Sequence, residues 1–351
     1  MKKVKEFKLV ECRGTPYEIG QQWGAGCKEN LIKALENSFN LMSLMYQAPQ
    51  EEVVAKAMKF LPQIQEFDPY LIAIMRGQAD STGLSFEEIV TLKCMNELTF
   101  YYHNIAALCT TLAATGKATE GGKTFMGQNI DWSPEATIDL LKIHHSEGPV
   151  QIILSFSNST EYALSSAGFG ICALATIGMD YAFNLPLACY LPKVMRQKNI
   201  HEAMEMLKQV AHGLGYYQLA GANGEIFGIE SISNDFEILR PENDMLLHSN
   251  HYITERFKHL DAAPQYLPDS YPRLERITLL ANQQFGKLNP GMAMEILADH
   301  DSPIKSICQH LDPAGPSPSL TLASFIMIPE EGTIYIAGGN PCEFEYIRYE
   351  L

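Results

Sequence analysis

Hydrophobic and polar residues follow two different periods along the chain, and the change falls near residue 108. Between residues 16 and 102, apolar residues recur every three to four positions, which is the spacing of one face of an α-helix. After residue 108, short β-branched and aromatic runs separated by turn residues predict β-strands. The pattern therefore predicts a helical first part and a mostly stranded second part.

The predicted elements are short and closely spaced. In the first part, helices are predicted over 17–42, 51–64, 68–78 and 86–102, the last one opened by a capping box at Ser85 and Glu88. In the second part, strands are predicted over 109–115, 123–130, 149–156, 161–165, 170–177, 216–220, 225–231 and 235–240, helices over 185–196, 200–210 and 271–284, and a closing β-meander over 320–328, 333–337 and 343–349. Strand runs flanked by helices predict packed layers, in which the first hundred residues bury their apolar faces against the same body.

Composition narrows the class of protein. The chain has 351 residues, 46% of them hydrophobic and 19% charged, as expected of a folded globular protein, and no apolar run is long enough to span a bilayer. The lysines near the start precede no apolar stretch, so we expect no secretory signal and a cytoplasmic location. With 41 acidic and 26 basic residues the formal charge is −15, which disfavours nucleic-acid binding.

The eight cysteines are scattered and include no C-x-x-C pair, so we expect reduced thiols, most of them buried as small hydrophobic side chains. His144–His145 and the run Asp299, His300 and Asp301 have no partner at a recognised metal-ligand spacing. No glycine-rich nucleotide loop is present. The sequence therefore predicts neither a metal nor a cofactor.

Cys109 lies where the helical hydrophobic pattern ends and the strand-like pattern begins. If 109–115 and 123–130 form a hairpin centred near Thr119, Cys109 lies opposite roughly Gln128 or Asn129, and Asp131 lies close by at the same end of the sheet. Two interpretations follow from this spacing: a core cysteine beside a turn aspartate, or a nucleophilic thiol with an acidic neighbour.

Six segments occur in the order and composition of one enzyme family. They are GTPYEIG at 14–20, the string CTTLAATGKATEGGKTFMGQNIDW at 109–132, SSAG at 165–168, HSNH at 248–251, PDS at 268–270 followed by Arg273 and Arg276, and SIC at 306–308. Together they make the chain resemble the acyl-CoA:6-aminopenicillanic acid acyltransferase family, the C45-type group of self-processing N-terminal-nucleophile hydrolases. The resemblance extends from about residue 14 to residue 308.

The resemblance implies a fold and a maturation step. The fold is α+β, a four-layer αββα sandwich of two antiparallel sheets covered by helices. Autocatalytic cleavage between Leu108 and Cys109 would leave a helical α segment, 1–108, and a catalytic β segment, 109–351, associated as one structural domain. Thiol catalysis by an N-terminal cysteine suits this arrangement, because a free α-amino group with a pKa of roughly 7.7 to 8.0 can accept the thiol proton.

The resemblance also implies residue roles. Cys109 is the nucleophile, Asp131 holds the new amino group, and Asn250 donates to the oxyanion of the tetrahedral intermediate. Candidate supporting residues are Arg273, Ser306 and Ser166. His248 and His251 are expected to be structural.

The expected activity is acyl transfer to, or hydrolysis of, a linear amide through an acyl-S-Cys109 intermediate, with acyl-CoA as a candidate co-substrate and no cofactor. One alternative is an amide hydrolase of the bile-salt, penicillin V or N-acylethanolamine type. Another is an uncleaved, inactive relative that serves as a binding protein, an alternative favoured by Leu108, since the family commonly has a small residue before the nucleophile. Gln309 stands where penicillin-related members carry arginine, so the resemblance alone does not imply penicillin chemistry for this chain.

Overall fold

The computed structural model describes residues 2–101, 108–176, 178, 185–210, 215–301, 306–311 and 319–351. Its strands are β1 (Leu9–Gly14), β2 (Leu108–Gly116), β3 (Gly122–Trp132), β4 (Ile138–His145), β5 (Val150–Phe156), β6 (Ser159–Ser165), β7 (Phe169–Leu174), β8 (Gly215–Gly221), β9 (Ile226–Ile232), β10 (Asp235–Leu239), β11 (Met245–His248), β12 (Leu320–Ile328), β13 (Thr333–Ala337) and β14 (Tyr346–Glu350).

The α-helices are α1 (Pro16–Gly26), α2 (Lys28–Tyr46), α3 (Gln50–Ala57), α4 (Leu61–Phe67), α5 (Pro69–Thr82), α6 (Phe86–Lys93), α7 (Met95–Tyr101), α8 (Leu187–Met195), α9 (Ile200–Val210), α10 (Ala263–Tyr266), α11 (Ser270–Gln283) and α12 (Pro290–Leu297). Short 3₁₀ turns occupy Met58–Phe60, Lys258–Leu260 and Pro329–Glu331. None of the helices in the described ranges is long and apolar enough to cross a membrane.

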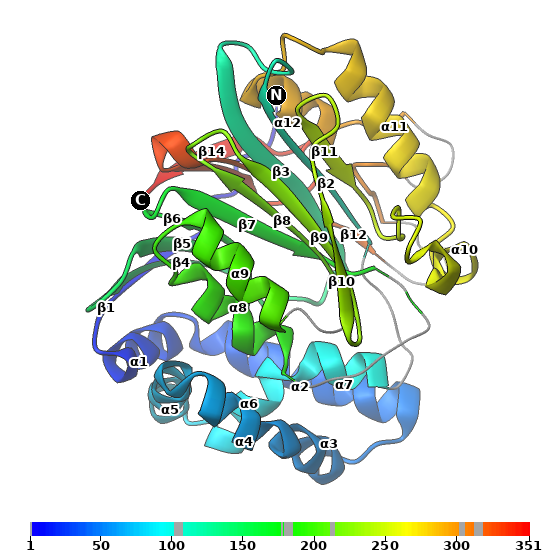
Figure 1. Ribbon diagram of the computed structural model, residues 1–351. Helices are drawn as coiled ribbons and strands as arrows, with labels where there is room; N and C mark the ends of the chain where they lie inside the picture. The colour runs from blue at the N-terminus through cyan, green and yellow to red at the C-terminus, as the bar shows by residue number, and fades with distance from the viewer. Residues whose placement is uncertain are drawn as a thin grey trace.

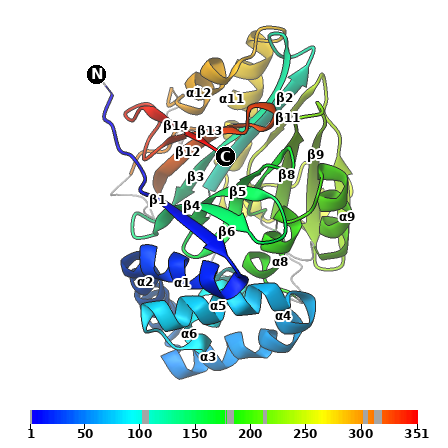
Figure 2. The ribbon, with the colours of Figure 1, turned by 90° about the vertical axis from the view of Figure 1, so that its left-hand side faces the viewer.

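Two β-sheets lie face to face between layers of helices (Figure 1). The eight-stranded sheet has the order β1-β4-β5-β6-β7-β8-β9-β10, and the six-stranded sheet has the order β11-β2-β3-β12-β13-β14. Neighbouring strands are antiparallel, apart from β1 and β4, which run parallel. Figure 2 shows α11 and α12 on one side of the sheets and α1–α6 on the other. The predicted αββα sandwich is confirmed.

Side-chain alternation along β2 explains the layering. Successive residues of a strand point to opposite faces, so Cys109 and Ala113 pack between the two sheets, whereas Leu112 and Ala114 pack against the outer helices. The outer face of the eight-stranded sheet buries a third core, in which residues of the segment 1–101 contact strands of the second part. The description of 1–108 and 109–351 as two segments of one domain stays a prediction.

The boundaries of the predicted helices differ from the structure. The stretch 17–42 is divided at Cys27 into α1 and α2, and 86–102 is divided at Cys94 into α6 and α7, although the capping box of Ser85 and Glu88 is present as predicted. The strands β1, β4 and β11 were not predicted. Each is short or only partly apolar, so its periodicity is weak.

Close packing of α1 on α5 accounts for the glycine of the first motif. A Cβ atom on Gly20 would lie 2.0 Å from the carbonyl oxygen of Ile74, and one on Gly77 would lie 2.2 Å from that of Tyr17. Only glycine permits this approach of two helix backbones. The motif at 14–20 therefore has a structural role in seating α1.

The hairpin of β2 and β3 is confirmed, but its register differs from the prediction by one or two residues. Gly116 pairs with Gly122, which centres the turn on Thr119, and a bulge between Ala114 and Gly116 then shifts the pairing so that Cys109 lies opposite Ile130. A bulge inserts one residue into one strand and reverses the face on which later residues lie. Asp131 consequently pairs with Leu108.

Candidate active site

Cys109 lies near the start of β2 with its thiol between the two sheets, and its side chain is 3% exposed. Burial, followed by the negative charge of Asp131, raises the pKa of the Cys109 thiol to about 12, although a backbone N–H of Asp131 that bonds to the sulfur acts in the opposite direction. A thiol with such a pKa is almost entirely protonated near neutral pH. In the continuous chain it is a poor nucleophile.

Asn250 lies beside Cys109 because of the pairing between β11 and β2. His248 pairs with Thr111 in antiparallel register, so continuing the register by two residues places 250 opposite 109. There the Asn250 side chain takes the place of a strand partner: its Oδ1 accepts the backbone N–H of Cys109 at 2.7 Å, and its Nδ2 donates to the carbonyl oxygen of Ala175 at 2.8 Å. The amide nitrogen of Cys109 is thus held by a side-chain oxygen.

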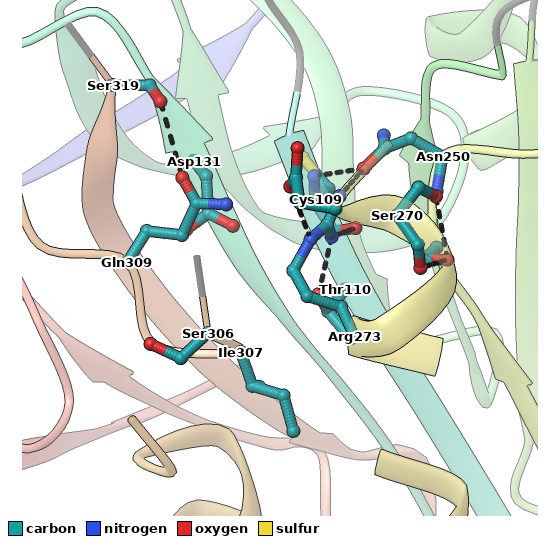
Figure 3. A network of polar contacts seen from close by, with 12 residues as sticks. Cys109, Thr110, Asp131, Asn250, Ser270, Arg273, Ser306, Ile307, Gln309 and Ser319 are labelled. Atoms are coloured by element: carbon teal, nitrogen blue, oxygen red, sulfur yellow. Dashed lines mark hydrogen bonds and ion pairs between the residues drawn. The ribbon is translucent and has the colours of Figure 1, made fainter. Parts of the chain in front are cut away.

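Arg273, on α11, holds the other side of the same residue (Figure 3). Its buried guanidinium donates from Nη1 to the Cys109 carbonyl oxygen at 2.6 Å and to Thr110 Oγ1 at 2.8 Å. Nη2 donates to Asn250 Oδ1 at 2.8 Å, and Nε donates to Asp269 Oδ2 at 3.0 Å. The predicted supporting role places Arg273 near the site, and the structure puts it in direct contact with Cys109 and Asn250.

A buried carboxylate anchors the loop that carries Asn250. Glu230, on β9, accepts from Nε2 of His248 at 2.8 Å, from the backbone N–H of Ile253 at 2.7 Å and from the hydroxyl of Thr254 at 2.5 Å. Burial acts to raise the pKa of Glu230, but the hydrogen bond and charge of His248, with these further donors, hold it below its usual value. The carboxylate therefore ties both sides of the Asn250 loop to β9.

Sequence reasoning missed two members of this network. Ser270 accepts the backbone N–H of Asn250 at 2.7 Å through its Oγ, although it was noted only as part of a family segment. Glu230 was not singled out. An isolated acidic residue within the apolar strand IFGIESI was the available signal, because such a residue is rarely buried without partners.

Asp131 lies on the other face of the sheet from the Cys109 thiol. It pairs with Leu108, whose side chain lies outside the described residues, and its Oδ1 accepts the hydroxyl of Thr321 at 2.5 Å. Figure 3 shows Asp131 on the side of Gln309, with Arg273 and Asn250 grouped around Cys109. Asp131 is thus a close neighbour of the site through its backbone.

The two candidate serines are not brought to Cys109. The hydroxyl of Ser306 donates to the carbonyl oxygen of Cys308 at 3.0 Å and points away from Cys109 in Figure 3. Ser166 is exposed in the turn between β6 and β7, where its Oγ accepts the backbone N–H of Val150 at 2.9 Å. That turn precedes Phe169, whereas Asn250, which bonds to Cys109, also bonds to Ala175 just past the other end of β7. Donors around Ser166 therefore lie about 20 Å away at the strand rise of 3.3 Å per residue.

The sequence profile of the family described as "Acyl-coenzyme A:6-aminopenicillanic acid acyl-transferase" matches residues 194–343. This match confirms the family resemblance. The matched range contains Asn250, Arg273 and Ser306 but begins after Cys109 and Asp131 in the sequence.

Solved structures of similar fold have low sequence identity to the chain. They include a mutant of the conjugated bile acid hydrolase from Clostridium perfringens, at 14% identity and a TM-score of 0.48, covering 69% of this chain and 97% of that one. A penicillin V acylase from Agrobacterium tumefaciens has 14% identity, a TM-score of 0.47 and coverage of 66% and 83%. The Caenorhabditis elegans N-acylethanolamine-hydrolyzing acid amidase ortholog has 13% identity, a TM-score of 0.45 and coverage of 69% and 100%.

Proposed function

We propose that the chain is a self-processing enzyme that transfers or hydrolyses acyl groups, with Cys109 as the nucleophile exposed by cleavage after Leu108. The observation that carries the proposal is the bonding of the Cys109 peptide on both sides, by Asn250 Oδ1 at the nitrogen and by Arg273 at the carbonyl oxygen. These two bonds fix the Cys109 nitrogen, which becomes the base after cleavage, and the start of β2, which carries the Cys109 sulfur. The family match over residues 194–343, which includes Asn250 and Arg273, supports acyl chemistry for the chain.

In the proposed cleavage, Cys109 Sγ attacks the carbonyl carbon of Leu108 and forms a carbon–sulfur bond. The Leu108–Cys109 carbon–nitrogen bond breaks, and the thiol proton passes to the Cys109 nitrogen, which becomes an amine. Water then hydrolyses the thioester, so that Leu108 ends in a carboxylate and Cys109 regains its thiol. Asn250 Oδ1 is placed to hold the Cys109 nitrogen before and after the bond breaks.

In the proposed turnover, the α-amine takes the thiol proton as Cys109 attacks the carbonyl carbon of a linear amide or thioester. The amine proton passes to the leaving group, and an acyl-S-Cys109 intermediate remains. Asn250 Nδ2 has two N–H groups, of which one donates to Ala175, so the other is the proposed oxyanion donor. Water, or an amine acceptor, resolves the intermediate. Asp131 is the proposed carboxylate that tunes the amine, and acyl-CoA is a candidate acyl donor.

The experiment is intact-mass measurement with N-terminal sequencing of the purified full-length chain. We expect fragments of 108 and 243 residues, the second beginning with Cys109, since 351 less 108 leaves 243. Cys109→Ala should remain one chain. Cys172→Ser is the matched control, because Cys172 is equally buried between the sheets and should not affect cleavage.

An uncleaved wild-type chain with full activity would overturn the processing step. An uncleaved chain that binds an amide or acyl-CoA without turnover would favour the alternative of a binding protein. Release of free acid without transfer to an amine would favour the amide hydrolase.

A further inference from the structure

Three side chains with metal-binding donors come from separate segments of the chain and lie close together in the structure. His300 follows α12, His310 lies in the segment 306–311, and Cys342 lies in the turn between β13 and β14. One ring nitrogen of each histidine and the sulfur of Cys342 lie within 4.8 Å of one another. Among the described residues, this is the one group of three or more His, Cys, Asp or Glu side chains whose donor atoms are close enough to share an ion.

The second nitrogen of each histidine faces an acceptor. His300 Nδ1 lies 3.0 Å from the carbonyl oxygen of Ala298, so a proton there leaves the lone pair on Nε2. His310 Nδ1 lies 3.7 Å from a carboxylate oxygen of Glu343, and its Nε2 lies 3.2 Å from the Cys342 sulfur. Histidines that bind metals usually have this outer partner, which fixes the tautomer and turns the other nitrogen toward the ion.

The sulfur chemistry points the same way. Seven of the eight cysteines are buried, and Cys342 is the one with intermediate exposure. The sulfur of Cys308 lies 3.5 Å from that of Cys342 and accepts an N–H of Asn340 at 3.5 Å, so a second sulfur borders the cluster. Ion-free, the two thiols are also close enough to form a disulfide after small movements.

We propose that His300, His310 and Cys342 bind a thiophilic divalent cation of the Zn²⁺ class. Zinc bonds of about 2.0 to 2.3 Å place tetrahedral donors roughly 3.3 to 3.8 Å apart, close to the 3.2 Å between His310 Nε2 and Cys342 Sγ. Three protein ligands leave the fourth position to water. The net charge of −15 favours cation binding over anion binding.

The site would order a segment that contacts the region of Asp131. Gln309, next to His310, donates its backbone N–H to Thr321 Oγ1 at 2.9 Å, and the same hydroxyl donates to Asp131 at 2.5 Å. Asn340 Nδ2 donates to the carbonyl oxygen of Gln309 at 2.5 Å. A metal bound by His310 and Cys342 would therefore hold the chain next to Gln309 and close to Asn340, the residues that make these hydrogen bonds. This effect does not depend on a catalytic role for Cys109.

The test uses the full chain, freed of metal by a chelator and kept reduced, and titrated with Co²⁺ and then Zn²⁺. We expect one cobalt per chain, with the near-ultraviolet absorption of a sulfur–cobalt bond, displaced by Zn²⁺. Cys342→Ser should lose this absorption, and His310→Ala should weaken binding by at least the roughly 10- to 100-fold known for loss of outer partners. His259→Ala, at another exposed histidine, is the matched control.

Binding without the sulfur–cobalt absorption, or equal binding by His310→Ala and wild type, would overturn the proposal. The absence of binding by the reduced chain would do the same. If the protein purified without reductant lacks metal and carries a Cys308–Cys342 disulfide that reduction removes without restoring metal affinity, the cluster is a redox pair instead. Because His310 is exposed and Cys342 is only partly buried, the variants are not expected to unfold, and thermal unfolding checks this directly.

Discussion

Replacing Arg273 by lysine separates the charge at this position from its geometry. The arginine donates four hydrogen bonds from three nitrogens, to Asp269, Cys109, Thr110 and Asn250. A lysine carries its donors on one atom and cannot span acceptors arranged around a planar fork. Arg273→Lys should keep a cation beside Asp269 and lose the bonds to Cys109 and Asn250.

The expected effect follows from the bonds lost. A hydrogen bond to a charged group contributes about 1.5 to 3 kcal/mol of stabilising free energy. Loss of the bonds to the Cys109 carbonyl and to Asn250 therefore removes about 3 to 6 kcal/mol of stabilisation. If all of this stabilisation is lost from the transition state of cleavage, the activation free energy rises by the same amount and cleavage slows by roughly 10² to 10⁴. Arg273→Met loses the same bonds and also leaves the buried Asp269 carboxylate without its cation, at a further cost of about 3 to 5 kcal/mol. Its loss of thermal stability should therefore exceed that of Arg273→Lys.

The assay combines thermal unfolding with a mass-resolved time course of cleavage. Arg273→Met with Asp269→Asn should be more stable than Arg273→Met alone, because the stranded charge is gone. Arg276→Lys is the matched control, three residues along α11 and partly exposed in its ion pair with Asp299. It should be cleaved at the wild-type rate.

Wild-type cleavage by Arg273→Lys would refute the positioning role of the guanidinium. If the double variant were no more stable than Arg273→Met, the destabilisation would not arise from the unpaired carboxylate. The stability comparison applies even to a chain that is never cleaved.

Three further outcomes are expected. Iodoacetamide should label Cys109 before the other thiols in the cleaved chain but not in an uncleaved one, because burial raises its pKa to about 12 until an amine base forms; first labelling of another cysteine with loss of activity would contradict this. Asn250→Ala should lower kcat by roughly 10² to 10³ in cleaved material with a smaller change in KM, and full activity would remove Asn250 from the oxyanion site. Burial, with the charges of His248 and Arg273, lowers the pKa of His251 from 6.5 to about 3, so the unfolded chain binds the extra proton and stability should fall by roughly 1.4 kcal/mol per unit as pH drops from about 6.5 toward 3. His251→Gln should remove that part of the slope of Tm against pH while exposed His259→Gln keeps it, and parallel curves for His251→Gln and wild type would exclude this origin.

The layers of the fold were predictable because their signals are local. Helical and strand periods depend on residues a few positions apart, and the change near residue 108 coincides with the start of β2. The β2–β3 turn was also local, and its centre at Thr119 was predicted correctly. The bulge after Ala114 was not, since no alternation pattern marks it, and that single residue moved Asp131 to the other face from the Cys109 thiol.

The partners of Cys109 were less accessible to sequence reasoning. Asn250 entered through family resemblance alone, because its position depends on β11, a four-residue strand too short to show a period. Its contact with Cys109 joins residues 141 positions apart. The cluster of His300, His310 and Cys342 has separations of 10 and 32 residues, so no motif of regular spacing revealed it.

The bonding around Cys109 bears on how activity would begin. Asn250, Arg273 and Asp269 are already joined in the continuous chain, and Glu230 already fixes the Asn250 loop. In the continuous chain the buried thiol has a pKa of about 12, and the Cys109 nitrogen is part of an amide and so is not a base. Cleavage at Leu108 would supply an amine of pKa roughly 7.7 to 8.0 on the nitrogen that Asn250 already holds. On this reasoning, breaking one bond activates the thiol toward external substrates without rearranging the residues around it, so an uncleavable chain should retain the same network around a Cys109 that does not turn over substrate.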